Sequence, residues 1–181
     1  MKNVFLNTAK RQRGAAIVVV MAILALAAGL GGLFDASKTS PRTLLEQALR
    51  SADPAWGVTV AADKQELRIG RDHMSLRIHT ARPGHLLVLQ AGTDGKNLQL
   101  IFPNDLDKET AIPVGETALP RPDWRFDAAG PAGEGALLAV VTANAPDVGA
   151  MRAALARGGL PDLGAGYGAA LATWRETEPK R

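Results

Sequence analysis

The feature that most constrains this chain is an uncharged, apolar segment close to its N-terminus. Residues 14–34 read GAAIVVVMAILALAAGLGGLF and contain no charged side chain. As a helix with a rise of about 1.5 Å per residue, a segment of this length spans about 30 Å, the thickness of the hydrocarbon core of a bilayer. The segment therefore predicts a transmembrane helix rather than a helix buried in an ordinary protein core.

Charged residues on the two sides of this segment predict its orientation. Lys10, Arg11 and Arg13 precede it, whereas the first charge after it is Asp35. Basic residues next to a transmembrane helix stay preferentially on the cytoplasmic side of the membrane. We therefore expect residues 1–13 to form a cytoplasmic basic tail and everything after the span to be exported.

Cleavage of the segment as a signal peptide is the alternative to an anchor. The apolar run is longer than the roughly 7–15 residues of a usual signal peptide, and Gly32–Ser37 at its end lacks a good small-x-small cleavage site. Ala25–Ala27 offers only a weak site. The pattern favours an uncleaved signal anchor, and release of a soluble secreted binding protein stays open.

Small residues recur at regular spacing within the predicted span. Ala25 and Gly29 are four positions apart, and so are Ala28 and Gly32. This spacing lets the backbones of two helices approach closely in lipid. A homodimer through the transmembrane helix is one hypothesis, and the alternative is that such segments are generally rich in Ala and Gly.

The distribution of charge argues against nucleic-acid binding. Four of the 21 Lys and Arg residues lie at positions 2, 10, 11 and 13, which leaves 17 against 18 Asp and Glu in residues 14–181. Binding to phosphate needs an excess of basic charge on the folded part of a chain. The chain also contains no cysteine, which excludes disulfides, thiol nucleophiles and cysteine-ligated metals. We expect no cofactor.

A short helix is predicted directly after the span. Ser40 suits an N-cap and Pro41 suits the first helical position, while Pro54 stops the helix. Residues 35–55 are therefore expected to form a juxtamembrane helix and linker.

A β-rich exported domain is predicted over residues 56–176, before a short tail at 177–181. Several short segments alternate apolar and polar residues with a period of two, the pattern of strands with one buried face. The glycines of Gly92–Lys96 predict a hairpin turn between two of them. Val148–Arg157 has helical composition, and Tyr167–Trp174 suits either a helix or a returning strand. The expected fold class is mainly β, a small β-sandwich or barrel-like domain, with an N-terminal transmembrane helix and a short C-terminal helix.

The predicted core of this domain consists of large apolar residues at the apolar phase of the strand patterns. These residues are Trp56, Leu76, Val88, Leu100, Phe102 and Val140.

The three histidines do not form a convincing metal site. His73 and His79 are six positions apart, or about 20 Å along a continuous strand, which is too far for one ion. Asp105, Asp107 and Glu109 alternate as in a calcium loop, but the Gly and Glu that such a loop needs at fixed positions are missing. We expect a protein without enzymatic activity. A small periplasmic hydrolase that uses His79 or His85 is the alternative.

Two polar loops are the candidate recognition surface. Gly92–Lys96 and Asn104–Glu109 flank the same predicted strand, and loops carry recognition because their side chains are not needed for core packing. They lie about 20 Å apart by strand rise, so they can share only a large ligand. The expected partner is a protein or a cell-wall glycan, and we expect exposed contact residues. The candidate partner-binding residues are Asp94, Lys96, Asn104, Asp105 and Asp107.

Several segments of the predicted β domain resemble a known family. The resemblance rests on Asp72–Leu76, Gly84–Leu89, Gly92–Gly95, Leu100–Asn104 with its Phe-Pro-Asn sequence, Gly115-Glu116 and Leu119-Pro120. Together they resemble the bacterial domain-of-unknown-function family 4384. The likeness extends over roughly residues 56–174, and Gly133–Thr142 is similar to the last core strand of the family.

The resemblance implies a compact β-rich module that binds or senses something outside the membrane, without defined catalytic residues. Pro146-Asp147 and Tyr167–Ala170 are similar to the tail of members attached to membrane-bound serine/threonine kinases of proteobacteria, some of them associated with type VI secretion. Only thirteen residues precede the span here, so a kinase domain is not expected. A stand-alone relative and a piece of a split kinase both stay open. The expected location is the bacterial inner membrane, with the C-terminal domain in the periplasm.

Overall fold

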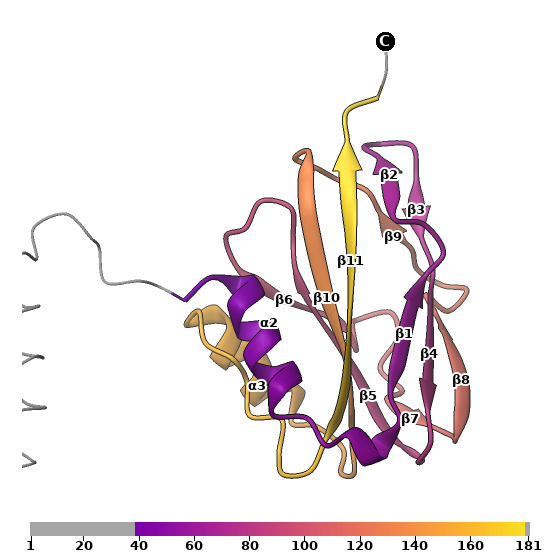
Figure 1. Cartoon of the computed structure of the whole chain (residues 1–181), viewed down its shortest axis with the longest axis vertical. Coiled ribbons are helices and arrows are strands. Elements are labelled where there is room, and N and C mark those ends of the chain that lie inside the picture. Colours follow the sequence, from indigo (N-terminus) through magenta and orange to yellow (C-terminus); the bar gives the residue numbers. More distant parts are fainter. Residues whose placement is uncertain (1–38, 180–181) are drawn as a thin grey trace, which may run out of the picture. The chain divides into compact units, whose positions relative to one another are not determined.

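The computed structural model describes residues 39–179, which belong to one compact unit. Helix α2 (Pro41–Arg50) and a 3-10 turn, η2 (Pro54–Trp56), precede a series of strands, and helix α3 (Val148–Ala156) comes before the last strand (Figure 1). No helix within the described residues has both the length and the apolarity needed to cross a bilayer. The predicted span at 14–34 and its small residues Ala25, Ala28, Gly29 and Gly32 lie outside the described residues.

Within residues 39–179, eleven strands make up most of the regular secondary structure. The strands are β1 (Thr59–Ala62), β2 (Glu66–Arg68), β3 (His73–Met74), β4 (Leu76–Thr80), β5 (Gly84–Ala91), β6 (Leu98–Phe102), β7 (Ala111–Ile112), β8 (Gly115–Leu119), β9 (Phe126–Asp127), β10 (Gly133–Thr142) and β11 (Gly168–Thr177). The prediction of a mainly β domain is confirmed. The segment with helical composition forms α3, and the ambiguous segment at 167–174 forms most of β11, a returning strand.

The strands are arranged in two larger sheets and one small one. A six-stranded sheet has the order β2-β11-β10-β5-β6, with β7 paired to β5 beside β6, and a three-stranded sheet has the order β1-β4-β8. Strands β3 and β9 form a separate pair. Strands β5 and β6 are antiparallel neighbours joined through the Gly92–Lys96 turn, which confirms the predicted hairpin.

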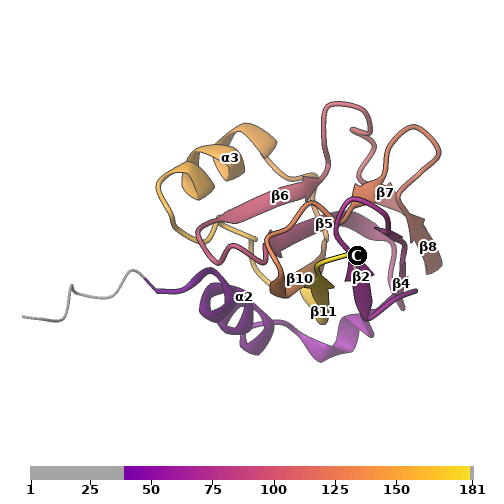
Figure 2. The same cartoon turned by 90° about the horizontal axis from the view of Figure 1, so that it is seen from above.

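Two hydrophobic cores lie on opposite faces of the six-stranded sheet. Figure 2 shows the layers, with α2 and α3 on one face of this sheet and β4 and β8 on the other. The core between the two larger sheets contains Trp56, Leu76, Ile78, Leu86, Val88, Phe102, Leu119, Leu137, Ala139, Val141 and Trp174. The core between the sheet and the helices contains Leu45, Ala48, Leu87, Leu89, Leu98, Leu138, Val140, Met151, Leu155 and Tyr167.

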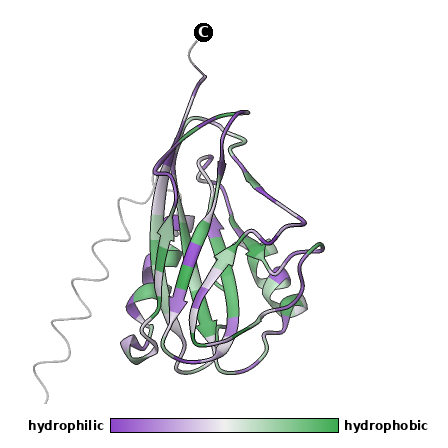
Figure 3. Cartoon of the chain, turned by 90° about the vertical axis from the view of Figure 1, so that its right-hand side faces the viewer, coloured by the Kyte–Doolittle hydropathy of each residue, from purple (hydrophilic) through white to green (hydrophobic). Residues whose placement is uncertain are grey.

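Strand β10 is at the centre of this arrangement, between β11 and β5. Leu137 and Val141 contribute to the core between the sheets, whereas Leu138 and Val140 contribute to the core beneath the helices. A strand that is covered on both faces reads as a continuous apolar run instead of an alternating one. This explains why Ala136–Val141 lacks polar residues. Figure 3 turns the side of β1, β4 and β8 toward the viewer, and there hydrophobic and hydrophilic colours alternate along the strands.

Helix α2 is an integral part of the folded unit. The Ser40 hydroxyl accepts a hydrogen bond from the Thr43 backbone N–H at 3.1 Å, so Ser40 is the N-cap, as predicted. On the buried side of the helix, Leu45 and Ala48 are at most 1 % exposed. The Tyr167 hydroxyl donates a hydrogen bond to the Ala48 carbonyl at 2.7 Å. The compact unit therefore begins before the domain start that we expected at residue 56.

The predicted core residues are buried with one exception. Leu100 is only partly buried, because it lies on β6 at the edge of the six-stranded sheet. The other five, Trp56, Leu76, Val88, Phe102 and Val140, are at most 5 % exposed.

Candidate functional site

The two predicted recognition loops flank β6, and β6 is the last strand of the six-stranded sheet. No strand within residues 39–179 pairs with its outer side. The backbone along that side, over Leu98–Phe102, is called the β6 edge below. In the turn before it, the Lys96 backbone N–H donates to an Asp94 carboxylate oxygen at 3.1 Å, and both side chains are exposed.

The loop after β6 is organised by the side chain of Asn104. Its Oδ1 accepts hydrogen bonds from the backbone N–H groups of Leu106 and Asp107, both at 2.9 Å. Its Nδ2 donates to the Ile101 carbonyl at 3.1 Å. Both polar atoms of the Asn104 side chain thus bind backbone groups of the loop or of the end of β6. Asn104 therefore shapes the turn and offers little to a partner.

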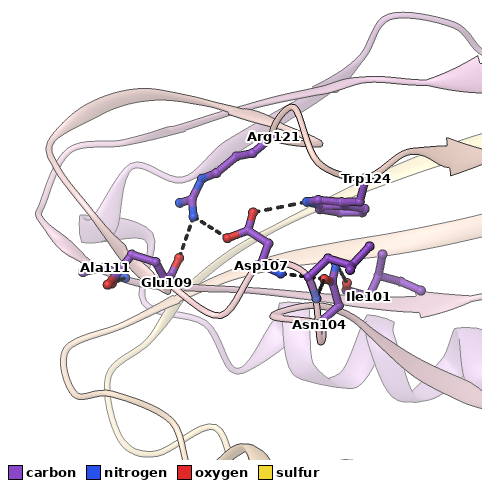
Figure 4. Close-up of polar contacts among 8 residues, drawn as sticks. Ile101, Asn104, Asp107, Glu109, Ala111, Arg121 and Trp124 are labelled. Atoms are coloured by element: carbon purple, nitrogen blue, oxygen red, sulfur yellow. Dashed lines mark hydrogen bonds and ion pairs between the residues drawn. The ribbon is translucent and has the colours of Figure 1, made fainter.

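Asp107 is buried, which contradicts the expectation that it is an exposed contact residue. Its side chain is 9 % exposed and lies between Arg121 and Trp124 (Figure 4). Arg121 Nη1 donates to Asp107 Oδ1 at 2.7 Å, and Trp124 Nε1 donates to Oδ2 at 3.2 Å. Arg121 also donates to the Glu109 carbonyl at 2.8 Å. This network anchors the loop to the domain, so the role of Asp107 is structural.

Aromatic rings extend this network into the core between the sheets. The Arg121 guanidinium lies 5.3 Å from the centroid of the Phe102 ring, a distance suited to a cation–π contact. The rings of Phe102 and Trp124 are stacked, with centroids 6.4 Å apart. The last residue of β6 and the loop that follows it are thus held by the same side chains.

Asp105, in contrast, is accessible. Its side chain remains 85 % exposed, although Arg152 Nη2 of α3 approaches its Oδ1 to 3.2 Å. Of the predicted contact residues, Asp94, Lys96 and Asp105 are therefore exposed at the two ends of β6. Sequence reasoning identified the two loops but missed Arg152, because its approach to Asp105 depends on tertiary structure.

A groove runs between the β6 edge and α3. Its volume is about 390 Å³. It is lined by Asn97, Leu98, Gln99, Leu100, Arg152, Leu155 and Ala156. Its Leu98 and Leu155 belong to the core beneath the helices, so the groove has an apolar floor and a polar rim. The sequence analysis did not identify this groove.

A second, larger pocket lies on the other side of α3. Its volume is about 530 Å³, and its floor includes Leu87, Met151 and Leu163. Asp147 and Asp162 at its rim already accept hydrogen bonds from the backbone N–H groups of Ala150 and Gly164. The run of Ala and Gly residues around α3 is the only sequence signal for this hollow, since small side chains leave the space open.

The three histidines lie on three different sheets. His73 is on β3 of the small sheet, His79 on β4 of the three-stranded sheet, and His85 on β5 of the six-stranded sheet. His85 Nδ1 is 2.9 Å from the Thr110 hydroxyl, and His79 is exposed opposite Glu116. In the part of the chain that the structure describes, no three His, Asp or Glu side chains come together as a metal site would require.

Comparison with known protein families identifies one matching family. Residues 66–145 match the family model described as "Domain of unknown function (DUF4384)". No curated protein matches the chain. The match extends from β2 to the loop after β10, so it includes β6, both flanking loops and the residues that anchor Asp107. Residues 66–145 therefore belong to the DUF4384 family of domains.

Proposed function

We propose that the chain is a membrane-anchored binding module that acts outside the cytoplasmic membrane. In this proposal, an extended segment of a partner polypeptide adds to the β6 edge as a further strand. The observation that carries the proposal is that β6 ends its sheet with neither a charge nor a proline among its five residues. Residues 14–34 and the basic residues before them support the anchored, exported location.

Unpaired strand edges tend to pair with strands of other chains, because they present a row of free backbone N–H and C=O groups. Proteins usually protect such edges with charged residues, proline, very short strands or β-bulges. The pairing of β6 with β5 shifts register between Val88 and Leu89, close to the end of β6. Strand β6, Leu-Gln-Leu-Ile-Phe, contains neither a charge nor a proline and is five residues long. Its edge is about 17 Å long, enough to pair with a partner strand.

The other outer strands of the two larger sheets differ from β6. Strand β8 carries Glu116 and lies between Pro113 and Pro120. Strand β2 is only three residues long and two of them, Glu66 and Arg68, are charged. Strand β1 lies beside β11 of the neighbouring sheet. This contrast supports the β6 edge as the place where a partner strand pairs.

The surroundings of β6 suit an extended polypeptide. In strand addition, main-chain hydrogen bonds supply affinity and pockets for alternate side chains supply specificity. The groove between β6 and α3 offers such a pocket, with Leu98 and Leu155 below and Arg152 at the rim. A protein is therefore favoured over a glycan, because a glycan cannot continue the backbone ladder. The resemblance to kinase-attached members supports a partner associated with a membrane kinase or a type VI secretion system.

The test is a selection of linear peptides from a displayed random library against the full-length chain. Peptides that bind by strand addition should protect the β6 amides from hydrogen exchange, and they should lose binding when Ala156→Arg fills the groove. Ala153→Arg is the matched control, since Ala153 is also an exposed alanine of α3 but does not line the groove. Peptides that bind the Ala156→Arg variant as well as the original chain would rule out the β6 site.

A further inference from the structure

We propose that a polar hollow on the small β3–β9 sheet binds a phosphate group. The hollow has a volume of about 410 Å³ and lies on a different sheet from the β6 edge. Its two strands lie side by side in Figure 1. The inference goes beyond the proposed function and does not depend on it.

Three side chains that carry or can accept a positive charge line the hollow. Arg71 precedes β3, His73 lies on β3, and Arg125 precedes β9, and all three are exposed. Within the described residues, neither Arg71 nor His73 forms an ion pair. Arg125 Nε is 3.8 Å from Asp127 Oδ1, a loose contact between two exposed side chains. The N–H groups of these side chains are therefore available to a ligand.

The carboxylate of Asp72 also lines the hollow, but cations of the protein already neutralise it. Its oxygens accept hydrogen bonds from the Arg68 side chain at 2.9 and 3.2 Å and from the Arg68 backbone N–H at 2.8 Å. Lys64 Nζ lies 3.6 Å from Oδ1. With both oxygens occupied, Asp72 repels a bound anion only weakly.

The charge around the hollow is opposite to that of the domain as a whole. Residues 39–179 contain 14 Lys and Arg against 17 Asp and Glu. The charged side chains that line the hollow, together with their ion-pair partners, are the basic Lys64, Arg68, Arg71 and Arg125 and the acidic Asp72 and Asp127. A local excess of basic charge on an acidic domain attracts anions to this one place.

The kind of cation favours a phosphate over a carboxylate. The guanidinium group is a planar fork of N–H donors that matches the oxygens of a phosphate. A phosphate ester has three strong acceptor oxygens, so it can bind Arg71, His73 and Arg125 together, whereas a carboxylate has only two oxygens. A volume of about 410 Å³ is within the range of about 300–1,000 Å³ that is usual for small-ligand pockets. The hollow therefore also has room for the group that carries the phosphate.

The test measures how fast phenylglyoxal, a reagent for arginine side chains, modifies single arginines of the full-length chain in an uncharged detergent. Inorganic phosphate is the probe, and it should slow the modification of Arg71 and Arg125 in a saturable way. Arg77 is the matched control in the same molecule, because it is an exposed arginine on β4 that does not line the hollow. Sodium chloride at the same ionic strength should protect none of the three.

Two substitutions should change the affinity in opposite directions. Arg71→Gln should raise the phosphate concentration that half-protects Arg125 by about tenfold, because it removes a charged donor. Asp127→Asn should lower that concentration by about threefold, because it removes a carboxylate that competes for Arg125. Arg77→Gln should leave it unchanged. A merely structural role of these side chains does not account for tighter binding by Asp127→Asn.

Nanodiscs of two lipid compositions distinguish a lipid headgroup from a soluble phosphate compound. If an anionic headgroup is the source, phosphatidylglycerol nanodiscs should protect Arg71 without added phosphate, and phosphatidylcholine nanodiscs should not. If a soluble compound is the source, protection should need added phosphate in both. Equal protection of Arg71 and Arg77, or no protection of Arg71 in any sample, would show that the hollow is not a phosphate site. The proposed function at the β6 edge would stand in that case.

Discussion

Asp107 and Arg121 form an ion pair of 2.7 Å that fastens the loop after β6 to the segment after β8. Trp124 Nε1 donates to the second oxygen of the same carboxylate, so both oxygens have a partner. A charge with its partners in place can be buried, whereas the same charge without them destabilises the folded state. The shape of the loop beside the β6 edge therefore depends on a carboxylate that a partner molecule cannot reach.

The first prediction follows from this ion pair. Asp107→Ala should lower the free energy of unfolding by about 1–3 kcal/mol, because it leaves the Trp124 N–H without an acceptor and removes the charged partner of Arg121, which keeps only the Glu109 carbonyl. Asp105→Ala in the same loop should change it by less than about 0.5 kcal/mol, since its ion pair is exposed. Urea denaturation of residues 39–179 measures both values. Equal effects of the two substitutions would contradict the structural role of Asp107.

The second prediction concerns α2. Leu45→Ala should lower the free energy of unfolding by about 2–5 kcal/mol, because Leu45 is completely buried between α2 and the six-stranded sheet. Gln47→Ala, at an exposed position of the same helix, should be nearly neutral. Thermal denaturation followed by circular dichroism compares them. If a fragment that begins at residue 56 were as stable as residues 39–179, the helix would contribute nothing to the domain.

The third prediction is that one substitution has opposite effects at two glycines. A Cβ at Gly135 on β10 would collide with the Trp174 ring, so Gly135→Ala should destabilise the domain by about 1–3 kcal/mol. Gly149 lies in α3, where its added methyl group meets only the Asp147 carboxylate at 3.4 Å. Gly149→Ala should therefore stabilise the domain by about 0.5–1 kcal/mol through helix propensity. Chemical denaturation of both variants measures the change in the free energy of unfolding. A change of the same sign in both variants would be inconsistent with the structure.

The fourth prediction concerns pH and Asp72. Hydrogen bonds from the Arg68 side chain, at 2.9 Å, and from the Arg68 backbone N–H hold the pKa of the Asp72 carboxyl well below its usual range. A carboxyl with a lowered pKa in the folded state stabilises that state above its unfolded pKa of about 4, and this contribution is lost as the pH falls toward the folded pKa. Asp72→Asn should therefore be less stable than the original chain at pH 7, and the difference should shrink below about pH 4. A difference that is constant over this range would show that the charge of Asp72 is irrelevant.

The fifth prediction concerns membrane topology. Because Lys10, Arg11 and Arg13 precede residues 14–34, a reporter that is active only in the periplasm should be active when fused after residue 181. Replacing the three basic residues by Asn should reduce this activity, whereas Lys108→Asn in the folded domain should not. A C-terminal fusion that is active only in the cytoplasm would contradict the exported location.

Much of the local structure could be predicted because it depends on residues close together in the chain. Ser40 caps α2 through a residue three positions later, and the glycines around Asp94 allow the turn between β5 and β6. The period of two identified strands such as β4, where buried and exposed residues alternate. These signals are local, so they can be read before the fold is known.

The candidate site could be predicted only in part. The sequence by itself determined which two loops flank β6 and that β6 carries no charge. Only the tertiary structure decided that β6 is the outer strand of its sheet, that α3 forms a groove beside it, and that Asp107 is buried. The physical reason is that strand order and the burial of a carboxylate depend on partners far along the chain. Arg121 and Trp124 lie fourteen and seventeen positions from Asp107, and no local pattern joins them to it.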